Sequence, residues 1–71
     1  MYKYRLIIAG NQPIGVTSDS PELTVREIFR LAGRDTNGYT FNSEGRDIQL
    51  DSIVQAGGRI AASTKLAGGR N

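Results

Sequence analysis

One segment of this 71-residue chain carries the periodicity of a helix. Its apolar residues recur at the three- and four-residue spacing of a single helical face: Val25, Ile28, Phe29 and Ala32. Thr24 and Glu27 have the spacing of a capping box, and Gly33 provides a natural stop, so the sequence predicts a short helix between these limits. A lone helix has to bury its apolar face against another element, and the remaining segments of this chain have the patterns of strands.

Alternating polarity predicts a strand at each end of the domain and short strands between them. In residues 2–8 the larger apolar side chains occupy every second position, which is typical of a half-buried strand. Further strands are expected near 14–16, at 39–42, at 47–50 and at 59–65. Pro13 cannot donate a hydrogen bond to a ladder, so the strand that follows it should lie at a sheet edge. For residues 51–54 we expect a single helical turn.

The order of these segments limits the topology. A hairpin, a helix, two short strands, a turn and a final strand place one helix across a mixed sheet of about four to five strands. The crossover lets the last strand pair parallel to the first, deep in the sheet. We therefore expect an α+β domain with the β-grasp arrangement over residues 1–65, followed by a flexible C-terminal tail at 66–71.

The composition excludes several kinds of chemistry. The chain has no Cys and no His, which removes disulfides, thiolate nucleophiles, imidazole acid–base catalysis and zinc sites of the usual Cys/His kind. A domain of 71 residues closes one thin core and has no room for a deep, water-excluding active site as well. We therefore expect a protein that is not an enzyme and that holds no metal or cofactor of its own.

Charge and hydropathy do not indicate nucleic acid or membrane as a partner. Nine Lys and Arg against seven Asp and Glu leave a net charge of +2, and the pI of 9.4 follows from that small excess. The predicted helix carries Arg26 and Arg30 four positions apart, and Arg34 follows its end. We interpret these arginines as a solvated face. No apolar run approaches the ~18 residues that span a bilayer, so a cytoplasmic protein is expected.

The residue patterns resemble those of ubiquitin-like proteins over nearly the whole chain. The similarity includes the Gly10 turn, the 23–28 segment that starts the helix, the Gly45 turn, the 50–53 segment and the Gly68-Gly69 pair. More narrowly, residues 4–8 and 26–28 resemble bacterial ubiquitin-like and multi-ubiquitin-domain proteins. Those proteins are typically encoded beside activating-enzyme-like, carrier-enzyme-like and peptidase-like partners, in systems thought to act in defence or stress.

The chain contains two Gly-Gly pairs, whereas nine glycines in 71 residues produce about one by chance. Gly57-Gly58 lies between Val54 and the last predicted strand, where a tight turn explains it. Gly68-Gly69 lies beyond the last apolar residue, where no requirement of the fold explains it.

The resemblance implies a covalent modifier whose carboxylate is activated at Gly69. An activating enzyme has to pass the end of the modifier through a narrow channel to ATP, and glycine fits because it has no side chain and permits any backbone conformation. The acyl-adenylate becomes a thioester on a partner cysteine and then an ester or amide on a target protein. Every catalytic group belongs to the partners, which use the ATP. Arg70 and Asn71 follow the pair, so we expect a peptidase to trim them after Gly69.

Residues near the tail and on the sheet are the expected contacts with these enzymes. Leu66 and Ala67 lead into the glycine pair. Arg59 and Lys65 lie near the tail, where positive charge steers an acidic partner. Ile7 is the apolar exception on the outward face of the first strand, and the last strand is its expected neighbour.

Two other functions stay open. A sulfur carrier of the ThiS/MoaD kind shares the fold and bears a C-terminal thiocarboxylate, but such carriers normally end at the glycine pair, so the Arg70-Asn71 extension argues against one. A non-covalent interaction module leaves the tail idle. A bulky residue at position 69 discriminates between these functions, because a pure binding module keeps its function and a modifier or carrier loses it.

Overall fold

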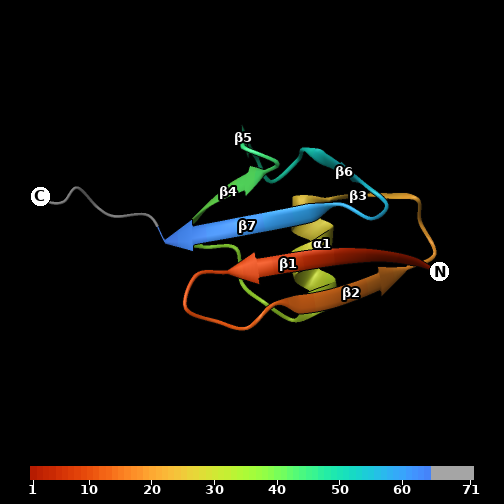
Figure 1. Ribbon diagram of the computed structural model, residues 1–71, viewed down its shortest axis with the longest axis horizontal. Coiled ribbons are helices and arrows are strands. Elements are labelled where there is room, and N and C mark those ends of the chain that lie inside the picture. The colour runs from red at the N-terminus through yellow and green to blue at the C-terminus, as the bar shows by residue number, and fades with distance from the viewer. Residues whose placement is uncertain (65–71) are drawn as a thin grey trace, which may run out of the picture.

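The computed structural model describes residues 1–64, and it places a mixed five-stranded sheet against one helix (Figure 1). The elements are β1 (Tyr2–Ile8), β2 (Ile14–Ser18), β3 (Glu22–Thr24), α1 (Val25–Ala32), β4 (Tyr39–Ser43), β5 (Arg46–Ile48), β6 (Ile53–Gln55) and β7 (Arg59–Thr64). The expected α+β architecture with a single helix and a mixed sheet is confirmed for this part of the chain. No helix in it is long and apolar enough to cross a membrane.

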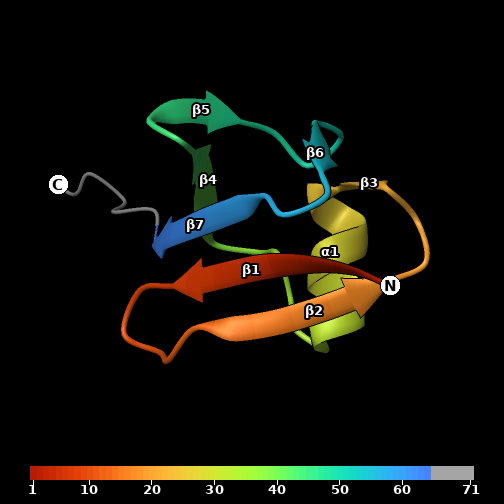
Figure 2. The ribbon, with the colours of Figure 1, turned by 45° about the vertical axis from the view of Figure 1, so that its right-hand side comes forward.

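The strands of the main sheet lie in the order β2-β1-β7-β4-β5. β1 pairs antiparallel with β2 and parallel with β7, and β7 pairs antiparallel with β4. The predicted parallel pairing of the first and last strands is therefore confirmed, and β2 lies at an edge as Pro13 requires. The helix lies across one face of this sheet (Figure 2).

The core lies between α1 and the face of the sheet that the helix covers. Its members are Tyr4, Leu6, Ile8, Val16, Leu23, Val25, Ile28, Phe29, Phe41, Val54, Ile60 and Ala62. Phe29 is fully buried on the helix and packs edge-to-face on Phe41 of β4, with ring centroids 5.3 Å apart. Burying a side chain of this size stabilises the fold by about 1.5–3 kcal/mol, so the helix is held mainly by this apolar face.

Tyr4 is the core residue with a polar end. Its hydroxyl donates to the carbonyl oxygen of Ser20 at 2.7 Å, which fixes the segment between β2 and β3. Burial, followed by the nearby charge of Glu22, raises the pKa of this phenol, so it stays protonated and remains a donor at neutral pH.

Both ends of the helix are capped as the sequence predicts. The Thr24 hydroxyl accepts from the Glu27 backbone N–H at 3.2 Å, and the Glu27 carboxylate accepts from the Thr24 backbone N–H at 2.9 Å. At the other end Gly33 takes the left-handed conformation, with φ of 71°. The next residue, Arg34, donates its backbone N–H to the carbonyl of Phe29 at 3.0 Å, which closes the last turn.

The predicted helical turn at 51–54 is wrong. Residues 49–52 form a tight turn in which the Ser52 N–H donates to the Gln49 carbonyl, and the chain then enters β6, which pairs with β3 in a separate two-stranded sheet. The reason is a long-range contact. The first N–H groups of α1 have no partner within the helix, and those of Val25 and Arg26 donate to carbonyls of the 50–52 segment at 3.2 and 3.1 Å.

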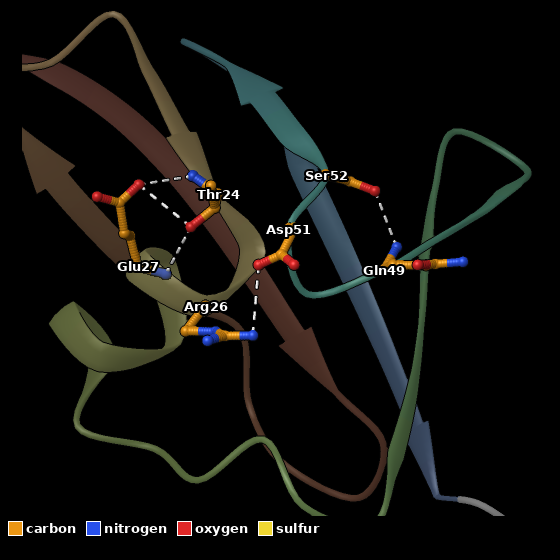
Figure 3. Close-up of polar contacts among 6 residues, drawn as sticks. All are labelled: Thr24, Arg26, Glu27, Gln49, Asp51 and Ser52. Atoms are coloured by element: carbon orange, nitrogen blue, oxygen red, sulfur yellow. Dashed lines mark hydrogen bonds and ion pairs between the residues drawn. The ribbon is translucent and has the colours of Figure 1, made fainter.

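One ion pair adds to this contact between the helix start and the 49–52 turn. Arg26 lies 3.3 Å from the Asp51 carboxylate, while the Gln49 N–H donates to the Ser52 hydroxyl at 2.9 Å (Figure 3). Both charged side chains are largely exposed, so the ion pair itself contributes little stability. The backbone bonds to the helix are what hold the 49–52 turn in place.

The cap makes the fold sensitive to acid at Glu27. Two hydrogen bonds from Thr24 hold the pKa of this carboxyl below its ordinary value of 4.5, and the bond from the backbone has a larger effect than the bond from the side chain. Because the Glu27 carboxyl has a lower pKa in the folded state than in the unfolded state, its ionised form stabilises the fold at pH values above the unfolded-state pKa. That stabilisation is lost as the pH falls through the folded-state pKa.

We expect Glu27→Gln to flatten the acid side of the stability profile. Glutamine keeps an acceptor oxygen for the Thr24 N–H but does not titrate. The melting temperature of the wild type, followed by circular dichroism from pH 7 to pH 3, should fall more steeply below about pH 4.5 than that of the variant. Parallel profiles over this range would show that the Glu27 charge does not stabilise the helix start.

Candidate functional site

The face of the sheet opposite α1 carries no covering element among residues 1–64, and we call it the open face. Side chains alternate along a strand, so burial of Tyr4, Leu6 and Ile8 directs the residues between them to this side. The residues of the open face on the two central strands are Lys3, Arg5 and Ile7 of β1 and Arg59, Ala61 and Ser63 of β7.

The structure brings together two of the residues that the sequence analysis proposed for partner binding. Ile7 lies opposite Ala61 in the parallel ladder, and Arg59 precedes Ala61 on the same side of β7. They line one hollow of about 370 Å³, whose wall is completed by Asn42, Glu44 and Gly45 of the β4–β5 hairpin. We call it the apolar hollow, because the apolar residues Ile7 and Ala61 line it.

A second hollow lies on the same face, over β1 and β2. It measures about 490 Å³, and its charged residues are Lys3, Arg5 and Arg59. Three glycines also line it: Gly15, Gly57 and Gly58. We call it the basic hollow, and Arg59 lines both hollows.

Sequence reasoning missed Lys3 and Arg5 as candidate functional residues. The alternation in 2–8 does place them on the outward face with Ile7. The sequence pattern does not predict the register of the strands. In the structure Arg5 of β1 lies directly opposite Arg59 of β7 and directly opposite Gly15 of β2.

The Gly57-Gly58 turn joins β6 to β7 and is bonded to β1. The Gly57 N–H donates to the Lys3 carbonyl at 2.8 Å, and the Arg5 N–H donates to the Gly58 carbonyl at 3.0 Å. Gly57 has φ of 82°, which side chains disfavour, and a Cβ on Gly58 would lie 2.5 Å from Cγ1 of Val54. The prediction that a tight turn explains this pair is therefore confirmed.

The remaining predicted site residues lie outside the residues that the structure describes. They are Lys65, Leu66, Ala67, Gly68, Gly69, Arg70 and Asn71. Their proposed roles in activation, trimming and partner binding stay predictions. Within residues 1–64 no three His, Cys, Asp or Glu side chains are grouped closely enough to hold a metal ion.

Comparison of the chain with protein-family models, with curated proteins and with solved structures found no match in any of the three.

The two glycines that line opposite sides of the basic hollow should respond differently to alanine. Gly58→Ala forces a Cβ against Val54 and the Gln55 carbonyl, and we expect a loss of about 1–3 kcal/mol in the free energy of unfolding. A Cβ on Gly15 meets nothing within 4 Å, so Gly15→Ala should leave stability unchanged or raise it by up to about 1 kcal/mol. Urea denaturation of both variants measures the difference, and equal stabilities would contradict this account of the turn.

Proposed function

We propose that this chain is a ubiquitin-like protein modifier with a β-grasp fold, activated through the carboxylate of Gly69. The observation that carries the proposal is the parallel pairing of β1 with β7 at the centre of a mixed sheet crossed by one helix. The order β2-β1-β7-β4-β5 supports the β-grasp assignment, because it is the arrangement that the resemblance implies.

The contrast between the two glycine pairs supports a role for the second. The geometry of the β6–β7 turn requires both Gly57 and Gly58, so the fold accounts for that pair. Gly68 and Gly69 follow β7 in the sequence, after the last strand of the sheet. Glycines in this position would suit a reaction that requires backbone without side chains.

The chemistry proceeds through one adenylation and three acyl transfers once the Gly69–Arg70 peptide bond has been hydrolysed by a peptidase. The Gly69 carboxylate attacks the α-phosphorus of ATP and pyrophosphate leaves. A cysteine thiolate of the activating enzyme then attacks the acyl-adenylate and AMP leaves. A cysteine thiolate of the carrier enzyme attacks this thioester and releases the first thiolate. An amine or hydroxyl of the target finally attacks the second thioester and the carrier's thiolate leaves. All catalytic groups belong to the partners, and this chain supplies the acyl group and a docking face.

A non-covalent interaction module is the second candidate. The open face favours it, because Ile7, Ala61 and the neighbouring cations offer a contact surface that does not involve the glycine pair. The two candidates differ in whether a covalent bond forms at Gly69.

We expect an ATP-dependent adduct when the chain is incubated with the enzymes encoded beside its gene. Intact mass spectrometry should show loss of Arg70 and Asn71, followed by linkage of the trimmed chain through Gly69. A chain ending at Gly69 should react without the peptidase, and Gly69→Val in that chain should abolish linkage, because the side chain blocks the enzyme's channel.

A matched glycine control keeps this test specific. Gly33→Asn changes a glycine at the end of α1, where asparagine is the usual second choice, and it should be linked as the wild type is. Replacement of one carboxylate oxygen by sulfur, without linkage, would identify a sulfur carrier instead. Retention of Arg70 and Asn71 with no adduct of any kind would overturn the modifier proposal in favour of non-covalent binding.

A further inference from the structure

The basic hollow concentrates positive charge, and among residues 1–64 none of its three cations forms an ion pair. Arg5 and Arg59 lie directly opposite each other in the β1–β7 ladder, and Lys3 lies on the same side of β1. Like charges on adjacent strands repel one another and destabilise the sheet. Among residues 1–64 the single ion pair joins Arg26 and Asp51, far from this hollow. An anion bound from outside would relieve the repulsion.

Gly15 keeps the basic hollow open, although the fold gives no reason for a glycine there. It lies within β2, opposite Arg5, and its φ is not in the left-handed region. A Cβ at this position would meet nothing within 4 Å. Glycine inside a strand destabilises the fold by about 0.5–1 kcal/mol relative to alanine, and it often marks the place where a ligand or another backbone approaches closely.

The position of the apolar hollow indicates what kind of anion would bind. Arg59 lines both hollows, so a chain that places a carboxylate at Arg5 and Arg59 brings a neighbouring side chain over Ile7 and Ala61. An extended peptide can make both contacts, because every second side chain lies on the same side at a spacing of about 6–7 Å, which is also the spacing of Arg5 and Ile7 along β1. The occupant that fits is therefore an acidic segment with an apolar residue two positions from a carboxylate.

The rim of the apolar hollow disfavours nucleic acid. Glu44 lines it, so a phosphate backbone, which is charged at every nucleotide, would be repelled there, whereas a peptide can place its uncharged apolar residue at this rim. The only aromatic residue lining either hollow is Tyr4, which is 2% exposed and so offers no ring for a base to stack on. A larger hollow, of about 810 Å³, does not compete for an anion, because its only cation is Arg26, which is already paired with Asp51.

We propose that the basic hollow and the apolar hollow together dock an acidic segment of a partner protein, with its carboxylates held by Lys3, Arg5 and Arg59 and one apolar side chain over Ile7. The site lies within residues 1–64 and uses no residue of the glycine tail. It therefore goes beyond the proposed activation at Gly69 and holds equally for a modifier and for a non-covalent module.

The test is a titration of the full isotope-labelled chain, followed by amide chemical shifts. The probe is a pentapeptide of four glutamates around a central leucine, blocked at both ends, and its glutamine counterpart is the control. The glutamate peptide should shift amides of β1, of Gly15 and of Arg59, with an affinity that falls as salt is added. The glutamine peptide should shift none of them.

Variants separate this site from general charge attraction. Arg5→Gln and Arg59→Gln should each lower the affinity for the glutamate peptide by about two- to fivefold, which is the effect of losing one exposed ion pair. Arg34→Gln removes the same charge just after α1, which covers the other face of the sheet, and should change the affinity little. Gly15→Val should keep the melting temperature, since a Cβ at this position meets nothing within 4 Å, but weaken binding by about tenfold or more by filling the hollow.

Several outcomes overturn the proposal. They are shifts centred on the helix, equal binding of the glutamine peptide, a folded Gly15→Val variant that binds as the wild type does, and tighter binding of a single-stranded oligonucleotide at the same residues. Because the site excludes the tail, loss of conjugation in a Gly69 variant has no bearing on this result. Likewise, if the glutamate peptide does not bind, the modifier proposal is unaffected.

Discussion

The fold depends on the parallel pairing of β1 with β7 under the single helix. This ladder joins the first strand to the last, and it buries Leu6, Ile8 and Ile60 against α1. Because side chains alternate, the same pairing turns Arg5, Ile7 and the residues opposite them to the other face. The core and the candidate docking surface are thus two sides of one ladder, and a slip of one residue would exchange them.

Much of the fold was predictable, because the signals are local. The capping box of Thr24 and Glu27, the stop at Gly33 and the alternation in β1 each involve residues within a few positions of one another. The β3–β6 pair was not predictable in the same way. It consists of two three-residue strands that pair Leu23 with Val54 across about thirty positions, and its place is set by carbonyls that satisfy the start of α1. A local pattern carries no information on such a contact.

The candidate site was predictable in part for a related reason. Alternation and the expected parallel pairing were enough to place Ile7 on the outward face beside the last strand. The significance of Lys3 and Arg5 depends on register, since only the alignment with Arg59 and Gly15 produces a hollow lined by cations. The two glycine pairs also differ in whether the geometry or the sequence pattern accounts for them. The geometry explains Gly57 and Gly58 completely, whereas the role of Gly68 and Gly69 rests on the sequence pattern and on the proposed chemistry.

The parallel ladder also determines how the domain would respond to mechanical force. The start of β1 and the end of β7 lie at opposite ends of the same pair of neighbouring strands (Figure 1). A pull that separates these two ends acts along the strands, so it loads all the hydrogen bonds of the ladder in shear at once. Antiparallel neighbours pulled from adjacent ends instead open one bond at a time, like a zipper. A domain held at one terminus and pulled at the other would therefore resist unfolding, and its lifetime under tension would follow its unfolding rate.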